Sequence, residues 1–380
     1  PPTLSVLLVN HLVFVNSVKI AVFCRNILKG IVRQQFLIAL MATEPIAKKQ
    51  KMRKKIGTHN GAFHCDEVLA CSMLKMLPEY SDAEIIRTRD ENILKTCDIV
   101  VDVGGKYEPS SHRYDHHQRS FSGTMKSLGG MKWDIKLSSA GLVYLHFGKD
   151  ILSQLMKTSK DDPTIKLIYA KVYENLLQEI DAIDNGVDQF EGEPRYSIST
   201  NISSRVGALN PKWNDKNPDP EAGFAKALKM VEAEFLETVK YFKEVWLPAR
   251  TIVQTAIEKR FGVDPSGEII LIEKGCPWKD HLFALEQTLN VDVPIKFALF
   301  SDQNGKWRVQ CVPVSIKSFE NRLSLLEEWR GIRGDELSKL SGIPGCIFVH
   351  ASGFIGGNET REGALEMARA TLRNAREMQS

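Results

Sequence analysis

Histidine and acidic side chains crowd into one short segment near the start of the main body of the chain. The segment THNGAFHCDE covers residues 58–67 and holds His59, His64 and Asp66 within eight positions. Imidazole and carboxylate together form a ligand set that suits Mn²⁺, Zn²⁺ or iron. A lone histidine is usually structural, but three candidate ligands this close together predict a metal site.

Two further segments carry isolated carboxylates. Asp102 closes the apolar run DIVVDV at residues 98–103, where an acid is costly to bury unless it is paired or bound to a metal. Asp181 and Asp184 lie three apart in EIDAIDNG, residues 179–186, and so share one face of a helix. The alternative interpretations are a cap on the Gly-Gly turn for Asp102 and a helix-end cap for Asp184.

Two adjacent histidines follow an aspartate in the segment YDHHQR. If His116 binds a metal, Asp115 is expected to accept a hydrogen bond from its ring and fix its tautomer. His117 and Arg119 could then face a phosphate. The alternative is an exposed polar loop.

Apolar runs and helical periodicity alternate around these segments. The spacing predicts an α/β fold with a largely parallel sheet, whose strand ends gather polar side chains at one edge. We expect strands at residues 54–58, 84–88 and 98–103, and helices at residues 65–77, 138–147 and 163–183.

The second half of the chain has a different texture. A polar loop at 201–220 leads into a long helix at 221–260 that Pro248 should break. Strands are expected at 268–273, 296–301, 306–312 and 345–350, and a helix at 360–375. We therefore predict a leader at 1–53, a metal-binding catalytic α/β domain at 54–200, a loop and helical connector at 201–262, and a smaller substrate-binding α+β domain at 263–380.

The first residues are basic and free of acid. Residues 1–43 contain no Asp or Glu, which is typical of a mitochondrial transit peptide; a translated leader upstream of Met41 and a secretion signal are the alternatives. Residues 48–55 read KKQKMRKK and fit a nuclear import signal or a solvated basic arm. The expected localisation is therefore the mitochondrion, in its matrix, and the nucleus.

The overall charge and cysteine pattern exclude several classes. The formal net charge is only +3, so a strong general attraction to nucleic acid cannot be inferred from it. Seven cysteines without a CxxC pair argue against a disulfide framework or a zinc finger. Without an apolar run of roughly 18–20 residues, no membrane span is expected.

Taken in chain order, the four segments at residues 58–67, 98–103, 114–119 and 179–186 resemble the motifs of the DHH phosphoesterase superfamily. This superfamily includes RecJ-type exonucleases, nano-RNases and family II inorganic pyrophosphatases. More closely, residues 55–380 resemble the melanocyte-proliferating-gene-one family through HNGAFHCDE, DVGG, YDHHQRSF, EIDAIDNG and HASGFIGG. The resemblance implies a metal-dependent phosphodiesterase, namely a 3′–5′ RNA exonuclease of mitochondrion and nucleus. It also implies two divalent ions, Mn²⁺ with Mg²⁺ or Zn²⁺ as alternatives.

The resemblance assigns roles to particular residues. Asp102 would bridge the two ions and His117 would contact the scissile phosphate, which makes these two the implied catalytic residues. The implied metal ligands are His59, His64, Asp66, Asp102, His116 and Asp184, with Asp181 as a weaker candidate. The family pattern usually spaces the first three ligands at i, i+4 and i+6 with two carboxylates. Here the spacing is i, i+5 and i+7 with an imidazole in the middle, which leaves the metal open.

The C-terminal domain is expected to bind the substrate. HASGFIGG resembles the glycine-rich motif of DHH-associated domains, in which backbone N–H groups of Gly356 and Gly357 would hold a phosphate before a helix and His350 would add a donor. An ordinary strand-to-helix turn is the alternative. Further charge or stacking is expected from Arg119, Lys279 and Arg308.

The expected partner is RNA or a short oligonucleotide, with no membrane; the oligomeric state stays open, a homodimer being one option. Two other functions remain alternatives. One is a phosphohydrolase of dinucleotides, pyrophosphate or 3′-phosphoadenosine phosphate, which the small net charge mildly favours. The other is a non-catalytic metal-binding protein.

Overall fold

The structure is a computed structural model that describes residues 53–378. The predicted transit peptide and most of the predicted nuclear import signal lie outside these residues. No helix in the described part of the chain combines the length and the apolar character that crossing a membrane requires.

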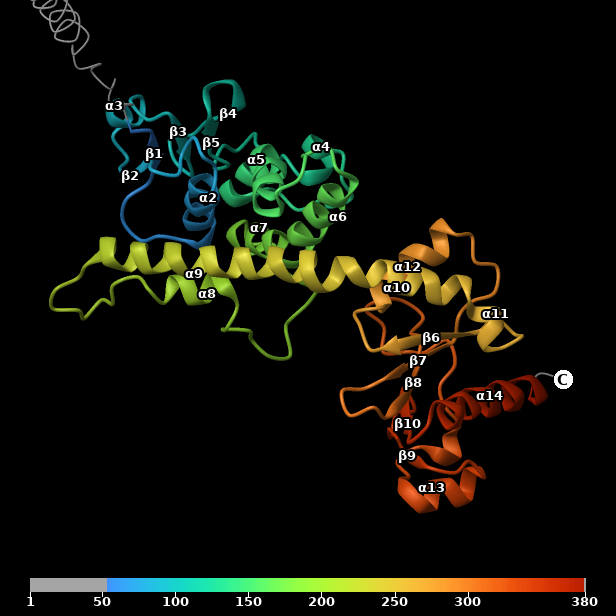
Figure 1. The fold of residues 1–380 in the computed structure, drawn as a ribbon. Helices are drawn as coiled ribbons and strands as arrows, with labels where there is room; N and C mark the ends of the chain where they lie inside the picture. The colour runs from blue at the N-terminus through green and yellow to red at the C-terminus, as the bar shows by residue number, and fades with distance from the viewer. Residues whose placement is uncertain (1–52, 379–380) are drawn as a thin grey trace, which may run out of the picture. The chain divides into compact units, whose positions relative to one another are not determined.

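The first sheet is parallel over four of its five strands. Its spatial order is β2-β1-β3-β5-β4, and only β4 runs antiparallel to its neighbour. The strands are β1 (Lys55–Thr58), β2 (Glu84–Arg87), β3 (Ile99–Val101), β4 (Tyr107–Glu108) and β5 (Arg113–Tyr114). The α/β class and the parallel sheet predicted from the sequence are confirmed (Figure 1), whereas the two-residue strands β4 and β5 were not anticipated.

Helices enclose this sheet. They are α2 (Cys65–Lys75), α3 (Glu91–Leu94), α4 (Met125–Gly129), α5 (Ser139–Met156), α6 (Pro163–Val172) and α7 (Gln178–Asp184). Ile56, Ile99 and Val101 join the large core that contains α2 and α5. Val100 instead belongs to a small cluster with Leu94 of α3. Successive strand side chains therefore point to opposite, covered faces, as parallel sheets require.

The predicted helix at 163–183 is one continuous helical stretch with a widened turn. A π-helical turn, Tyr173–Leu177, joins α6 to α7. Similar turns commonly occur at functional sites. This one directly precedes α7, whose last residue is Asp184.

The connector differs from its prediction at two points. The expected loop at 201–220 contains a short helix, α8 (Ile202–Gly207), capped by Asn201. The long helix is not broken at Pro248, because α9 (Pro220–Tyr241) passes through a π-helical turn at Phe242–Trp246 into α10 (Leu247–Glu258). Proline removes an N–H donor and clashes with the preceding turn; the wider turn before it accommodates both effects.

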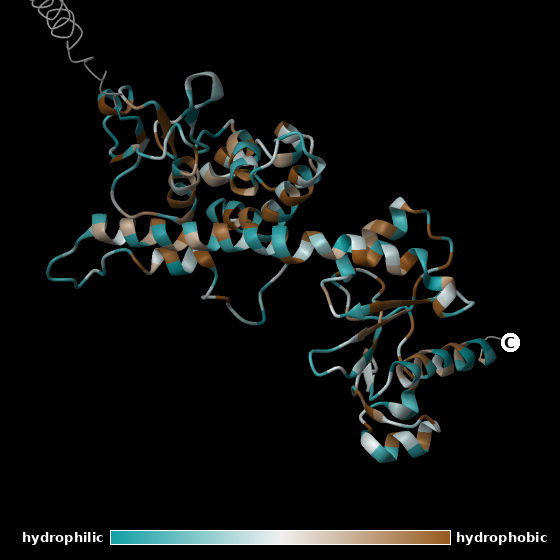
Figure 2. Ribbon diagram, viewed as in Figure 1, coloured by the Kyte–Doolittle hydropathy of each residue, from teal (hydrophilic) through white to brown (hydrophobic). Residues whose placement is uncertain are grey.

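The second sheet mixes parallel and antiparallel pairing in the order β6-β7-β8-β10-β9. Its strands are β6 (Ile269–Lys274), β7 (Phe297–Ser301), β8 (Trp307–Cys311), β9 (Cys346–Val349) and β10 (Ile355–Asn358), with helices α11 (Arg260–Val263), α12 (Lys279–Thr288), α13 (Gly334–Ser341) and α14 (Arg361–Glu377). Figure 2 shows the first part of β6 as apolar, while α14 is largely polar. Because both faces of β6 bury isoleucines, the sheet has a core on each side. The predicted α+β character is confirmed; the exact domain boundaries stay a prediction.

Candidate metal centre

Three neighbouring strands deliver the chemical groups to one edge of the first sheet. His59 follows the last residue of β1, Asp102 follows β3, and Asp115 follows β5. These strands are adjacent and parallel, so their carboxyl ends meet at the same edge. The topology thus explains how residues more than fifty positions apart come together.

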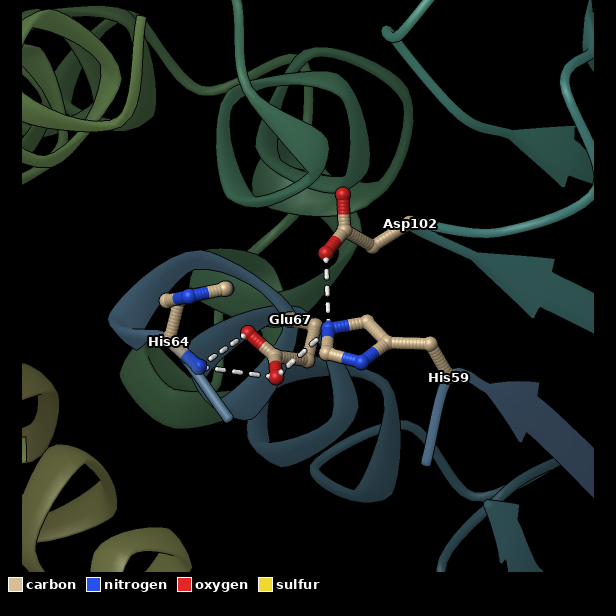
Figure 3. Close-up of side chains that lie close together, drawn as sticks. All are labelled: His59, His64, Glu67 and Asp102. Atoms are coloured by element: carbon tan, nitrogen blue, oxygen red, sulfur yellow. Dashed lines mark hydrogen bonds and ion pairs between the residues drawn. The ribbon is translucent and has the colours of Figure 1, made fainter. Parts of the chain in front are cut away.

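The first group of side chains is built around His59. Its Nε2 lies 3.0 Å from Oε1 of Glu67 and 3.3 Å from Oδ2 of Asp102 (Figure 3). Its Nδ1 donates to the backbone oxygen of Asn60 at 3.1 Å, which leaves the lone pair of a neutral ring on Nε2. His64 completes this group, whose ligand atoms all lie within 4.8 Å of one another.

Glu67 has two tasks in this group. Its carboxylate accepts the backbone N–H of His64 at 2.8 and 2.9 Å, closing the first turn of α2. The same carboxylate is completely buried and faces His59. It was missed from the sequence, although an acid three residues after a helix cap is a recognisable capping signal.

The second group is built around His116. Its Nε2 lies 3.1 Å from Oδ2 of Asp184, and Asp66 belongs to the same group. Nδ1 of His116 is 3.2 Å from the side-chain oxygen of Asn185. The Asn185 amide donates in turn to the backbone oxygens of Lys136 and Asp181, so its oxygen faces the ring and accepts the Nδ1 proton.

The sequence prediction for Asp115 was therefore wrong. Asp115 Oδ1 accepts a hydrogen bond from Nδ1 of His117 at 2.8 Å, not from His116. Its other oxygen accepts the backbone N–H of Gly105 at 2.6 Å. The Gly105 N–H thus orients Asp115, and Asp115 holds the exposed ring of His117 beside the cluster. Within residues 53–378, Nε2 of His117 has no hydrogen-bond partner. Asn185 takes the position expected of Asp115 because its helix end returns to the same edge of the sheet.

Asp102 lies between the two groups. Its Oδ2 faces Nε2 of His59 at 3.3 Å, while its Oδ1 faces Nε2 of His116 at 3.4 Å. Ser139, the first residue of α5, donates its hydroxyl to Oδ1 at 3.1 Å and its backbone N–H to Oδ2 of Asp66 at 3.3 Å. Asp102 itself adopts a left-handed backbone with φ +59°, a conformation that is uncommon outside glycine and is concentrated at functional sites.

Asp181, the weaker candidate ligand, is occupied elsewhere. It accepts hydrogen bonds from the backbone N–H and hydroxyl of Ser138 and from the hydroxyl of Tyr173, at 2.7 to 2.9 Å. Burial raises its pKa to about 7 despite these donors. It anchors α7 to α5.

The donor set fits divalent cations. Asp66 Oδ1 and His116 Nε2 are buried without a hydrogen-bond partner among the described residues, although His116 Nε2 has carboxylate oxygens 3.1 and 3.4 Å away. Two ligands at right angles around an ion, each at about 2.1 Å, are roughly 3 Å apart. Short separations without hydrogen-bond alignment are what converging ligands produce.

The pKa shifts within the cluster also favour a bound cation. Burial lowers the pKa of His59 and of His116, but their carboxylate neighbours outweigh it and raise the pKa to about 10 and about 9. Burial, with the nearby charges of Asp102 and Asp184, raises the pKa of Asp66 well above its usual range. Without an ion, protons must therefore neutralise this cluster; a cation would take their place.

Two cavities flank the cluster, and Asp102, His64 and His117 line both. One, of about 410 Å³, is otherwise lined by Asp66, Asp184 and mostly apolar or small side chains: Phe63, Cys65, Ile180, Ile183, Ser203, Ser204 and Gly207. The other, of about 290 Å³, is completed by His59, Arg89, Val103, Gly104, Gly105 and Asp115. The ion-binding edge is thus accessible from two sides.

The structure gathers all six predicted metal ligands and His117 at this edge. It does not gather the predicted substrate residues there, because neither cavity is lined by Arg119, Lys279, Arg308, His350, Gly356 or Gly357. Arg119 is exposed in the loop after His117. Lys279 begins α12, with its Nζ 5.8 Å from the Trp278 ring centroid.

The expected glycine-rich phosphate cradle is not formed. Gly356 and Gly357 lie inside β10, which pairs with β8 on one side and β9 on the other, so they do not form a loop with free N–H groups before a helix. Arg308 is paired with Asp302 and stacks on Phe348. His350 is exposed just after β9. Substrate binding by these residues stays a prediction.

Comparison with known proteins places the chain in a family. Residues 55–372 match the family model MYG1_exonuc, described as "Uncharacterised protein family (UPF0160)". MYG1 exonuclease of Bos taurus is 58% identical over 87% of this chain and 90% of its own length, and that of Homo sapiens is 56% identical over 88% and 91%. A MYG1 protein of Caenorhabditis elegans is 52% identical over 84% and 96%.

Among solved structures, the pGpG-specific phosphodiesterase PggH of Vibrio cholerae aligns with a TM-score of 0.27 and 14% identity, covering 85% of this chain and 98% of that one. RecJ of Thermus thermophilus in complex with Mn²⁺ aligns with a TM-score of 0.23 and 13% identity, covering 85% and 52%. The assignment rests on the sequence comparisons, which confirm the resemblance noted above: the chain belongs to the MYG1 exonuclease family.

Proposed function

We propose that this protein is a metal-dependent phosphodiesterase, and more narrowly a 3′–5′ RNA exonuclease with two divalent ions, Mn²⁺ being the expected metal. The name exonuclease of relatives 56–58% identical to the chain supports a nuclease. The clustered imidazoles and carboxylates support the dependence on metal.

The position of Asp102 carries the two-ion proposal. Its two oxygens face different histidines, His59 and His116, which belong to different ligand groups. A carboxylate whose two oxygens are directed at separate sets of ligands could hold one ion with each oxygen. The hydroxyl of Ser139 keeps the Asp102 carboxylate in this orientation.

Bound divalent ions would supply charge stabilisation for a phosphodiester and a water of lowered pKa. The chain's own residues orient the candidate metal ligands and supply a proton donor. His59 and His116 present Nε2 because Asn60 and Asn185 accept their Nδ1 protons. His117, whose Nδ1 proton is held by Asp115, can donate from Nε2 to a phosphate oxygen at the open side of the cluster.

The test is the Asp102→Asn variant, which keeps the shape of the side chain and removes its charge. Purified protein with Mn²⁺ is offered a labelled RNA 20-mer, a dinucleotide and pyrophosphate. Wild-type protein is expected to release single nucleotides from the 3′ end, and Asp102→Asn to lose this activity by at least a hundredfold. Asp98→Asn is the matched control, because Asp98 precedes β3 at its other end and pairs with Lys54.

Full activity of Asp102→Asn would contradict the bridging role. Release from the 5′ end would contradict the polarity. Turnover of only the dinucleotide or pyrophosphate would favour a small-substrate phosphohydrolase. The limited volumes of the two cavities, about 410 and 290 Å³, support that alternative. Absence of any turnover would indicate a non-catalytic metal-binding protein.

We also propose dual localisation to mitochondrion and nucleus. The acid-free segment 1–43 and the basic cluster at 48–55 support it. Fluorescent fusions beginning at Pro1 and at Met41 test the proposal: the longer form should reach mitochondria and the shorter form the nucleus. Identical distributions would contradict it.

A further inference from the structure

The smaller of the two cavities contains one cationic side chain that no intramolecular contact explains. Arg89 lines it together with His59, Asp102 and His117. Among the described residues, Arg89 has no hydrogen-bond or ion-pair partner, although two carboxylates line the same cavity. Those carboxylates are already occupied, Asp102 by His59 and Ser139 and Asp115 by His117 and Gly105.

The arginine two positions earlier shows the difference. The side chain of Arg87 is only 3% exposed; it donates to Glu221 and to the backbone oxygen of Gly61 and lies over the ring of Phe224. Arg87 therefore has a structural task, whereas Arg89 is exposed and keeps its guanidinium available.

The backbone holds Arg89 at the site. Arg89 follows β2, the edge strand next to β1, so it lies at the same carboxyl edge as the metal-binding cluster. The N–H of Thr88 donates to the oxygen of Thr58 at 2.7 Å, and Asp90 caps α3 through the N–H of Asn92 at 2.8 Å. With both neighbours fixed, the guanidinium starts from a defined point beside the cavity.

The larger cavity has the opposite character. Among the described residues, neither lysine nor arginine lines it. Beside the candidate metal ligands, His117 and small side chains, its lining includes the apolar Phe63, Ile180 and Ile183. An apolar surface suits a nucleoside, whereas a free guanidinium suits a phosphate, which it can bind through two parallel hydrogen bonds. The two sides of the cluster thus match the two parts of a nucleotide chain.

We propose that Arg89 binds the substrate phosphate next to the scissile one, so that the terminal nucleoside occupies the larger cavity and the remaining oligonucleotide passes Arg89. This inference rests on the proposed function, since it assumes that the scissile phosphate lies at the cluster. It makes Arg89 a positioning residue that recognises a second phosphate; a substrate with a single phosphate gains nothing from it.

The test combines a protein variant with a substrate variant. Binding of a fluorescent RNA 8-mer is measured by anisotropy for wild type, Arg89→Ala and Arg89→Lys, each with the natural oligonucleotide and with one whose phosphate next to the scissile linkage is a neutral methylphosphonate. Lys95→Ala is the charge control, because Lys95 is exposed before β3, at the opposite edge of the sheet.

Arg89→Ala is expected to weaken binding about 10- to 100-fold, the range for a charge-assisted contact. The methylphosphonate should weaken wild-type binding similarly and add little to the variant. The slope of log K against log salt should fall by about 0.7, the value for one phosphate contact on a single strand. Arg89→Lys should keep that slope but bind more weakly than wild type, and Lys95→Ala should match wild type.

Additive effects of Arg89→Ala and the methylphosphonate, or unchanged binding in Arg89→Ala, would overturn the proposal. Hydrolysis is measured separately for wild type and Lys95→Ala, with bis(p-nitrophenyl) phosphate as a single-phosphate substrate that both should turn over at the same rate. If wild type bound RNA with the expected Arg89 coupling but cleaved nothing, the proposed function would fail while this inference stood. If wild type neither bound nor cleaved, both would fail.

Discussion

Replacing Ser139 by alanine removes one hydroxyl that orients the central carboxylate. The Ser139 hydroxyl is completely buried and lies 3.1 Å from Oδ1 of Asp102 and 3.0 Å from the backbone oxygen of Tyr114. The substitution leaves the backbone N–H of Ser139 on Asp66, and Tyr114 keeps the N–H of Asp102 as a donor. The hydroxyl has one proton for these two acceptors, and the substitution removes it from both. Because Tyr114 still accepts the Asp102 N–H, the main change is in the orientation of the Asp102 carboxylate.

The magnitude follows from that single contact. A hydrogen bond to a charged group contributes about 1.5–3 kcal/mol, and loss of a group that orients a metal ligand typically costs 10- to 100-fold in metal affinity. These figures agree, because 10- to 100-fold corresponds to about 1.4–2.7 kcal/mol. We expect the dissociation constant for Mn²⁺ to rise by that factor in Ser139→Ala.

Isothermal titration of the metal-free protein with Mn²⁺ measures the effect. Ser153→Ala is the matched control, because Ser153 lies in the same helix and its hydroxyl donates to the backbone oxygen of Thr158, far along α5 from the cluster. Wild-type affinity in Ser139→Ala would refute the reasoning. Equal losses in both variants would show that a general loosening of α5 is the cause.

Two other predictions concern stability. In the metal-free protein the pKa values of His59 and His116 are about 10 and about 9, against 6.5 in the unfolded chain. The protonated rings therefore stabilise the folded state fully below pH 6.5, and this stabilisation is lost as pH rises through 9 to 10. Calorimetry in a chelator should therefore show Tm falling over this range, and a constant or rising Tm would contradict it. Arg87→Lys cannot keep the bonds to both Gly61 and Glu221; we expect a loss of about 1–2 kcal/mol in urea unfolding, and unchanged stability would show that Arg87 does not secure the loop after His59.

Much of the site could be predicted because strand ends are visible in the sequence. Short apolar runs fixed the ends of β1 and β3, and parallel pairing then brought His59 and Asp102 to one edge. The residue types and their order along the chain then indicated which side chains are metal ligands. The partners that orient the ligands could not be predicted this way, since Ser139 and Asn185 reach the cluster only through the packing of α5 and the end of α7.

The second domain shows why glycine-rich segments mislead. The glycine-rich segment predicts a phosphate-binding turn, but Gly356 and Gly357 lie in β10, between β8 and β9 and against bulky neighbours. A Cβ on Gly356 would lie 2.9 Å from Leu325, and one on Gly357 would lie 2.8 Å from Arg308. Close packing and phosphate binding demand the same residue, and only tertiary contacts separate them.

The left-handed backbone at Asp102 limits which substitutions can report on its charge. Most residues pay roughly 1–2 kcal/mol in that conformation, whereas asparagine and glycine tolerate it. An alanine or glutamate at this position would thus shift the strand end as well as alter the carboxylate. A loss of activity in such a variant would therefore have two explanations. Asparagine is the informative replacement. Glycine is a second one, because it deletes the side chain without straining the left-handed backbone.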